Sequence, residues 1–180
     1  MRSSFATETV TLRDGTQVVL RAIRPDDAPR LQALHKRLSP ESVFLRFLDQ
    51  RKALTDQDAQ RWATVDYRTH MAIVAALPDG DDERLIGVAR YAAIDPAKPD
   101  TAEAAIVVQD DHQGRGLGTI LVNRLVTYAR AHGIRAFVAS VHYSNSEIMH
   151  FIQRSGLPAK KRLEAGVWEI HIRLDAPSGD

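Results

Sequence analysis

The sequence predicts a mixed α/β fold in which one sheet carries helices on its faces. Segments with strand and helix patterns follow one another in the order two strands, helices, three strands, helix, strand, helix, strand. The 180 residues, 44% hydrophobic and 26% charged, have the composition of one globular domain. Because no repeat, low-complexity segment or linker interrupts them, we expect a single domain over residues 1–180, with a core from about 7 to 174 and a flexible tail from 175 to 180.

The first third of the chain predicts a β-hairpin followed by three helices. Residues 7–23 alternate in polarity around Asp14 and Gly15, a pair that tolerates positive φ in a tight turn, and the first strand is a candidate sheet edge. Ser39 as an N-cap and Pro40 at a first helical position mark one helix start. The residues at helical spacing are Leu31, Leu34, His35 and Leu38 in the first helix and Val43, Phe44, Phe47 and Leu48 in the second, and the third helix is expected over residues 56–65.

The remaining residues predict five strands and two helices. Residues 71–77 and 85–94 form an expected hairpin around a turn at 78–82, and further strands are expected over 101–109, 134–141 and 167–174. A long helix ends near Gly133, and another over 145–155 is closed by Gly156. An exposed final strand would be a natural dimer edge, so both a monomer and a homodimer stay open.

Charge, cysteine content and hydropathy exclude several classes of protein. Lys and Arg total 24 against 23 Asp and Glu, so no basic field exists to hold nucleic acid. The absence of cysteine excludes disulfides, iron–sulfur clusters, thiolate zinc sites and a thiol nucleophile. No apolar stretch has the length of a signal peptide or membrane span, and no histidines have a close metal-ligand spacing. We therefore expect a cytoplasmic protein with no membrane, nucleic-acid or metal partner.

The most informative segment is QDDHQGRGLGTIL, residues 109–121, which joins a strand to the long helix through Gly114, Gly116 and Gly118. The backbone amides of residues 114–118 can point at one place, where the positive end of the helix dipole also acts, and such a turn suits a pyrophosphate. Arg115 could add positive charge. The letters match neither the dinucleotide-binding glycine pattern nor the Walker loop. The alternative is that the glycines only make a tight strand-to-helix turn.

Residues 113–118, QGRGLG, match the Q/R-x-x-G-x-G/A signature of the GNAT superfamily of acetyl-CoA-dependent N-acetyltransferases, in the same place between a strand and a long helix. The segments AEAAIVV, GTILVNRLVTYARAHGI and AFVASV, with Asn145 eleven residues before Gly156, also resemble that superfamily. The upstream stretch TLRDGTQVVLRAIRPDDAPRLQALHKRLSPESVFLRFL resembles the start of the acetyltransferase domain of bacterial Pat-type protein lysine acetyltransferases. The resemblance implies the GNAT fold, a twisted and mostly antiparallel sheet of about six or seven strands with helices on both faces and splayed central strands.

The resemblance also implies a binding site for acetyl-CoA, the acyl donor. The loop amides would bind its pyrophosphate, the strand before the loop would pair with the pantetheine arm, and Asn145 would reach that arm with its amide. For Asn145 the alternative is a helix N-cap, and both roles can hold at once. The implied cofactor-binding residues are Ile106, Val107, Val108, Gln113, Gly114, Arg115, Gly116, Leu117, Gly118, Thr119 and Asn145.

Glu103 is the candidate catalytic residue, because it lies ten residues before Gln113 and resembles the general-base glutamate of the superfamily's protein lysine acetyltransferases. A lysine has a pKa of about 10.4, so a base must take a proton before the amine attacks near neutral pH. The neighbours of Glu103 are small or apolar, and burial among them would raise its pKa. The alternative is a solvated glutamate on the outer face of the strand.

The general acid of many superfamily members is a tyrosine seven residues after the asparagine, and that position holds Ile152. Phe151 beside it also lacks a hydroxyl. Weaker substitutes just before the helix are His142, Tyr143 and Ser144, and water alone could protonate the thiolate. His112, next to Gln113, is the remaining histidine of interest, with a solvated residue at the strand end as the favoured interpretation.

We expect direct transfer of acetyl to a primary amine, and the Pat-type resemblance favours a lysine ε-amine on a protein. The alternatives are a small amine (a polyamine, an amino acid or an aminoglycoside) and a non-catalytic acyl-CoA sensor. A cationic acceptor would need acidic residues near the gap, and residues 79–83 with Asp110 and Asp111 are candidates. The second and third helices, part of the acceptor site in the superfamily, carry charges that a solvated surface would also explain: Arg46, Asp49, Arg51, Asp56, Asp58 and Arg61.

Overall fold

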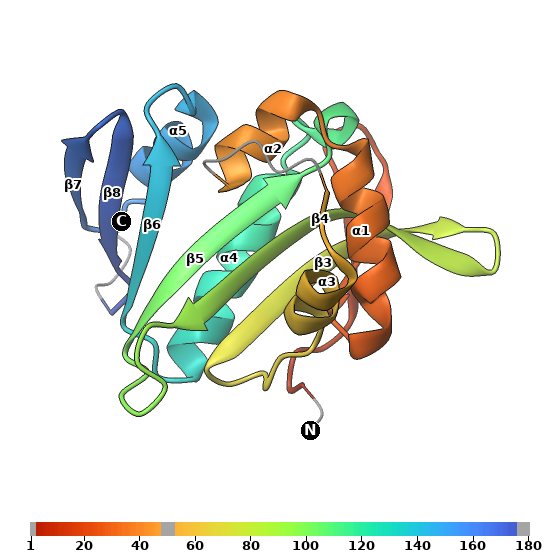
Figure 1. The fold of residues 1–180 in the computed structure, drawn as a ribbon, viewed down its shortest axis with the longest axis horizontal. Coiled ribbons are helices and arrows are strands. Elements are labelled where there is room, and N and C mark those ends of the chain that lie inside the picture. The colour runs from red at the N-terminus through yellow and green to blue at the C-terminus, as the bar shows by residue number, and fades with distance from the viewer. Residues whose placement is uncertain (1–2, 48–52, 176–180) are drawn as a thin grey trace.

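The computed structural model describes residues 3–47 and 53–175 (Figure 1). Leu48, Asp49 and Arg51, and the expected tail from 176 onward, lie outside the described residues. Within them the chain forms, in order, β1 (Glu8–Thr11), β2 (Gln17–Ala22), α1 (Ala28–Arg37), α2 (Pro40–Phe47), α3 (Asp56–Ala63), β3 (His70–Asp79), β4 (Asp82–Ala93), β5 (Thr101–Val108), α4 (Leu117–Ala131), β6 (Ala136–His142), α5 (Ser146–Arg154), β7 (Ala159–Glu164) and β8 (Val167–Arg173). Short 3-10 turns precede α1 and α4. No helix in the described part of the chain is long and apolar enough to cross a membrane.

The strands form one sheet in the order β1-β2-β3-β4-β5-β6-β8-β7. Every neighbouring pair is antiparallel except β5 and β6, which run parallel and pair over only three residues each, from Thr101 opposite Ala136 to Glu103 opposite Val138. Beyond Glu103 the two strands separate. The expected mixed, mostly antiparallel sheet with splayed central strands is therefore confirmed.

Four details differ from the sequence-based expectations. The described residues hold eight strands, one more than the upper expectation, because β7 has the charged sequence AKKRLE and shows no apolar alternation. The final strand β8 lies between β6 and β7, so it is not the exposed edge on which dimer pairing through this strand would depend. The turn between β3 and β4 is tighter than expected, since both strands extend to it and Gly80 supplies the positive φ of 62°. The helix α3 ends at Ala63, two residues early.

Helices cover both faces of the sheet. Figure 1 shows α1 and α3 in front of the sheet and α4 behind it, and α2 and α5 flank the upper ends of β5 and β6. The unbroken apolar run of β3 follows from this layering, because Met71, Ile73 and Ala75 pack in the cluster under α4 while Ala72 and Val74 pack in the cluster under α1 and α3. A strand that is buried on both faces needs no polar alternation.

A buried ion pair fixes where α1 leaves the sheet. Arg21 of β2, 1% exposed, donates to both carboxylate oxygens of Asp27 at 2.7 and 2.8 Å and pairs with Glu83 of β4 at 2.6 Å. Asp27 also accepts the backbone N–H of Arg24 at 2.8 Å. The carboxylate of Asp27 is thus saturated with donors, which is what a buried charge requires.

Candidate active site

The loop between β5 and α4 presents backbone amides without side-chain caps. Gly114 and Gly116 have φ of 72° and 89°, a region that favours glycine. Gly116 is the N-cap of α4, and no side chain caps the helix there. Leu117 is the first residue of α4, and its side chain is buried in the core. This burial fixes the position of the first helical turn, to which the Leu117 amide belongs. Free amides at a helix N-terminus favour an anion.

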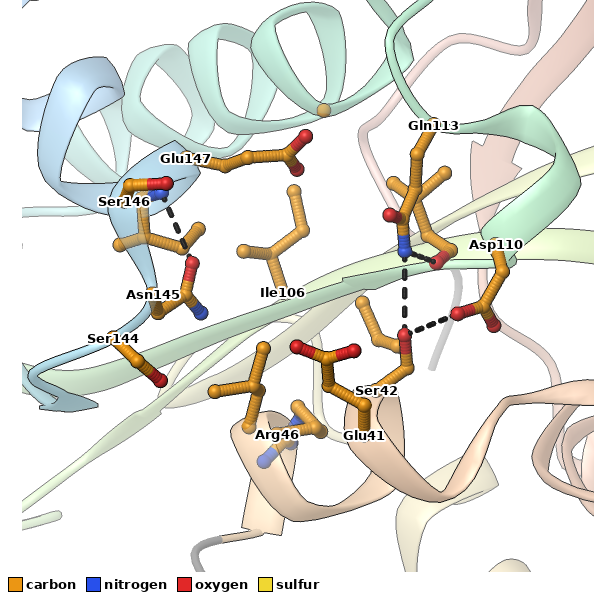
Figure 2. A pocket seen from close by; sticks show the side chains of 15 residues that line it. Glu41, Ser42, Arg46, Ile106, Asp110, Gln113, Ser144, Asn145, Ser146 and Glu147 are labelled. Atoms are coloured by element: carbon orange, nitrogen blue, oxygen red, sulfur yellow. Dashed lines mark hydrogen bonds between the residues drawn. The ribbon is translucent and has the colours of Figure 1, made fainter.

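The side chain of Gln113 ties this loop to its neighbours (Figure 2). Its Nε2 donates to the carbonyl of Val108 at 2.9 Å and to the Ser42 hydroxyl at 3.4 Å. The Ser42 hydroxyl in turn donates to Asp110 at 2.7 Å, which links α2 to the loop. Partial burial opposes ionisation of Asp110, but hydrogen bonds from Ser39 and Ser42 outweigh it and lower the pKa of its carboxyl. The network holds α2 against the end of β5.

Two clefts meet at the loop. The α2 cleft, of about 330 Å³, lies between α2, β5 and the start of α5, and Ile106, Val107, Val108, Gln113 and Asn145 are among its lining residues (Figure 2). The α4 cleft, of about 560 Å³, lies between the start of α4 and α5 and is lined in part by Gly114, Gly116 and Thr119. The side chain of Ile106 and the backbone of Gly118 line both. Ten of the eleven implied cofactor-binding residues therefore line a cleft or belong to the first turn of α4.

The strand gap is a third, mostly apolar hollow of about 100 Å³ between the separated ends of β5 and β6. Ala104 and Ile106 line it from β5, and Ala139 and Val141 from β6. Asn145 lines both the gap and the α2 cleft, and its Oδ1 accepts the N–H of Ile148 at 3.3 Å as the N-cap of α5. The N-cap role of Asn145 is thus confirmed, and its amide nitrogen remains available to a ligand.

Glu103 lies at the vertex of the strand gap, in the last residue pair of β5 with β6. Its side chain is exposed, and it lines neither cleft nor the gap among the cavities described above. By strand alternation it shares the α1–α3 face of β5 with Ala105 and Val107. The burial among small and apolar neighbours that the sequence suggested is therefore absent, and Glu103 is a solvent-exposed glutamate of β5.

The position that holds the general acid in many superfamily members is occupied here by an apolar side chain with apolar surroundings. Ile152 is 5% exposed and packs with Val141 and Ile170, while Phe151 lines the strand gap. Of the three substitutes, Ser144 lines the α2 cleft and its Oγ lies 2.8 Å from His142 Nδ1. Tyr143 is 62% exposed and lines none of the three cavities. A hydroxyl–imidazole pair therefore stands beside the cleft where no tyrosine does.

Two residues of the loop lie differently from the sequence-based expectations. The Arg115 guanidinium pairs with Asp14 at 2.6 Å and donates to the Asp111 carbonyl at 2.5 Å, and its side chain lines neither cleft. His112 is 8% exposed, so the favoured interpretation of a solvated histidine is wrong. The 3-10 turn after β5 folds its ring inward, and Nδ1 has no hydrogen-bond partner among the described residues. Burial lowers the pKa of His112.

Arg13 is a cleft residue that the sequence analysis did not single out. Arg13 follows β1, yet its side chain lines the α4 cleft beside loop residues such as Gly114, which lie about one hundred positions later in the chain. No local pattern marks it, because only the folding of the hairpin against the loop brings it there. Its backbone N–H donates to the Arg115 carbonyl at 3.2 Å.

Arginines lie on the α1–α3 face beside Glu103. Arg90 of β4 is half-buried, and its guanidinium carbon lies 5.5 Å from the centre of the Trp62 ring. Within the described ranges Arg90 makes no hydrogen bond and no ion pair. Burial, then the charges of Arg46 and Arg61, lowers the pKa of Arg90 to about 10. An arginine in this setting lacks a counter-charge.

The acidic candidates are mostly engaged elsewhere. Asp82 and Glu83 pair with Arg30 and Arg21 at the β3–β4 end of the sheet, and Asp110 accepts a hydrogen bond from Ser42 of α2. Among residues 3–47 and 53–175, no group of three or more His, Cys, Asp or Glu side chains could hold a metal ion.

Comparison with known proteins identifies the fold and the family. The model of the Acetyltransferase (GNAT) family matches residues 31–157. Acetyltransferase PA5475 of Pseudomonas aeruginosa is 34% identical over 125 residues, 69% of this chain and 66% of that protein. Acetyltransferase Pat of Mycolicibacterium smegmatis is 31% identical over 171 residues, 95% of this chain but 49% of Pat. The crystal structure of the GNAT domain of S. lividans PAT superposes with a TM-score of 0.83 at 32% identity, covering 93% of this chain and 96% of that one.

Proposed function

Because the chain belongs to the acetyltransferase (GNAT) family, whose acyl donor is acetyl-CoA, we propose that it acetylates the ε-amine of lysines on other proteins. The likeness to Pat and to the GNAT domain of S. lividans PAT extends over nearly the whole chain, the N-terminal hairpin included, and supports this acceptor class. Since the chain spans about half of Pat, any regulation by a further domain lies outside the proposal.

The observation that carries the proposal is the open sheet face at the vertex of the strand gap. Glu103 and Ser140 are exposed there, and the neighbouring side chains of Ala92 and Ala105 are small. Figure 1 shows no described helix in front of β5 and β6 below α2. A lysine that projects from a folded protein can reach such a face, whereas a closed pocket would exclude its carrier.

The residues present suit acetyl-CoA. In the proposed complex the amides of the loop and of the first turn of α4 bind the pyrophosphate, and the β5 backbone from Ile106 to Val108 pairs with the pantetheine arm. The amide nitrogen of Asn145 reaches the same arm. The thioester then lies in the strand gap, with its carbonyl carbon open to the face that carries Glu103.

Glu103 acts as the base in this proposal. Its carboxylate takes a proton from the incoming ammonium, directly or through one water, and an exposed position at the gap vertex is compatible with both routes. The neutral nitrogen attacks the carbonyl carbon, so that a C–N bond forms and the C–S bond breaks. The sulfur leaves with the electron pair and takes the proton of the Ser144 hydroxyl, whose Oγ lies 2.8 Å from His142 Nδ1. The second proton of the nitrogen passes through water to the Ser144–His142 pair, which is thereby restored. No covalent intermediate on the protein is needed.

A small amine that carries a carboxylate, such as an amino acid, is the second candidate acceptor. Arg90 favours it, because this half-buried guanidinium, which has no hydrogen bond or ion pair among the described residues, lies on the same face as Glu103. A carboxylate there would supply the missing counter-charge.

The experiment follows CoA release with acetyl-CoA and lysine-containing peptides, and with free amino acids in parallel. We expect Glu103→Gln to lower kcat about 100-fold near neutral pH and to leave acetyl-CoA affinity unchanged, because only the base is removed. In the same assay Ser144→Ala lowers kcat by a smaller factor. Glu164→Gln, an exposed glutamate on β7, is the matched control.

Two results would overturn the proposal. Wild-type kcat in Glu103→Gln would remove Glu103 as the base. Turnover of free amino acids with none of any lysine peptide would replace the protein acceptor by the second candidate.

A further inference from the structure

The tip of the β1–β2 hairpin is joined to the cofactor loop. The N–H of Arg13 donates to the Arg115 carbonyl at 3.2 Å, and the Asp14 carboxylate pairs with the Arg115 guanidinium at 2.6 Å. The hairpin precedes residues 31–157, the part of the chain that the family model matches. A segment outside that match therefore forms one wall of the α4 cleft.

Of the two arginines at the junction of the hairpin tip and the loop, Arg13 lines the α4 cleft and Arg115 does not. Asp14 neutralises Arg115, whose other contact is the Asp111 carbonyl, and the Arg115 side chain lines neither cleft. The Arg13 side chain does line the α4 cleft, and its Nε lies 3.4 Å from where a Cβ on Gly116 would be. Across the described part of the chain, Arg13 has no side-chain hydrogen bond or ion pair. Its positive charge is therefore available beside the loop amides.

The tip is built to hold Arg13 in place. Gly15 takes φ of 87°, the Thr16 N–H donates to Asp14 Oδ1 at 3.0 Å, and the Leu12 N–H donates to the Thr16 carbonyl at 2.8 Å. The Leu12 side chain is buried in the core. A buried residue on one side of Arg13 and a closed turn on the other fix its backbone, so less freedom is lost on binding.

The charges around the α4 cleft favour an anion. Arg154 of α5 lines it together with Arg13, and the start of α4, which has no side-chain cap, borders the same cleft. Glu147 is the acidic residue in its lining. We propose that Arg13 binds a phosphate of CoA, so that the N-terminal hairpin is part of the cofactor site.

The test measures the Kd of CoA and of dephospho-CoA, which lacks the 3′-phosphate, by calorimetry. We expect Arg13→Gln to weaken CoA binding about ten-fold and to reduce its salt dependence, because one charge-assisted phosphate contact is lost. Arg68→Gln is the matched control, since Arg68 is an exposed arginine that lines none of the clefts. A loss for CoA alone assigns Arg13 to the 3′-phosphate, and an equal loss for both ligands assigns it to the pyrophosphate.

Stability is measured alongside, as the Tm of each variant without ligand. If Arg13→Gln lowers this Tm, Arg13→Lys separates charge from folding, because it keeps the cation on a flexible stem. Retention of most CoA affinity in Arg13→Lys supports the proposal. CoA affinity in Arg13→Gln equal to that of Arg68→Gln overturns it, as does a loss in Arg13→Lys as large as in Arg13→Gln.

Discussion

The two sides of β5 are built on different principles. On the loop side the candidate binding groups are mainly backbone amides. Gly114 and Gly116 adopt positive φ, α4 begins without a side-chain cap, and the Gln113 side chain donates a hydrogen bond to the Val108 carbonyl. On the open face the candidate binding groups are side chains. Glu103 and Arg90 lie there without any ion pair among the described residues. The proposed donor side therefore offers mainly backbone amides, with Arg13 beside them, whereas the proposed acceptor side offers the separate side-chain charges of Glu103 and Arg90.

This contrast explains why one substrate is easier to assign than the other. A site made of amides depends on conformation, so three glycines suffice to encode it. A site made of separate side chains on neighbouring strands depends on which residues the sheet brings together, and Arg90 and Glu103 are thirteen positions apart on different strands.

The largest expected effect tests the backbone side. In Gly116→Ala a side chain must adopt φ near 89°, and its Cβ meets Arg13, so we expect the Kd of acetyl-CoA to rise about ten-fold or more. Gly133→Ala is the matched control, because Gly133 has φ of 84° at the far end of α4 with nothing within 4 Å. Both substitutions should lower the Tm, measured without ligand, by similar amounts. An equal loss of acetyl-CoA affinity in both would show that strain, not the site, causes it.

A smaller effect tests the side-chain face. If Arg90 binds an acceptor carboxylate, Arg90→Gln lowers kcat/KM for amino acids about five-fold relative to the corresponding amides, which lack that charge. Arg162→Gln, which removes an exposed arginine of β7 paired with Glu164 at 3.4 Å, is the control. An unchanged ratio of acid to amide in Arg90→Gln would leave the second candidate acceptor without support and would favour the protein lysine.

The smallest effect concerns pH beneath the cofactor loop. Burial lowers the pKa of His112 in the folded state below its unfolded value of about 6.5. The unfolded state then binds more protons, so the free energy of unfolding decreases as pH falls through about 6.5 and levels off below the folded pKa. Urea unfolding at several pH values should show a weaker decrease for His112→Gln than for His171→Gln, an exposed control. Equal slopes in the two variants would contradict this assignment.

Local sequence patterns predicted most of the fold. The features that the sequence analysis did not predict depend mainly on contacts between distant segments. The hairpin at Asp14 and Gly15, the N-cap at Asn145 and the loop glycines are each encoded within a few residues, and the structure has them. The strand β7 escaped notice because its side chains are charged and exposed. The burial of His112 and the place of Arg13 depend on contacts between distant segments, which periodicity does not report.

The separation of β5 and β6 also creates two sheet edges in the interior of the sheet. Unpaired strand edges invite pairing with other chains, and this molecule protects its outer edges by the shortness of β1 and by Lys160, Lys161 and Arg162 on β7. The inner edges carry no such charges, and instead α2 and α5 flank the opening (Figure 1). The helices that border the proposed pantetheine site therefore also shield these inner edges from pairing with other chains.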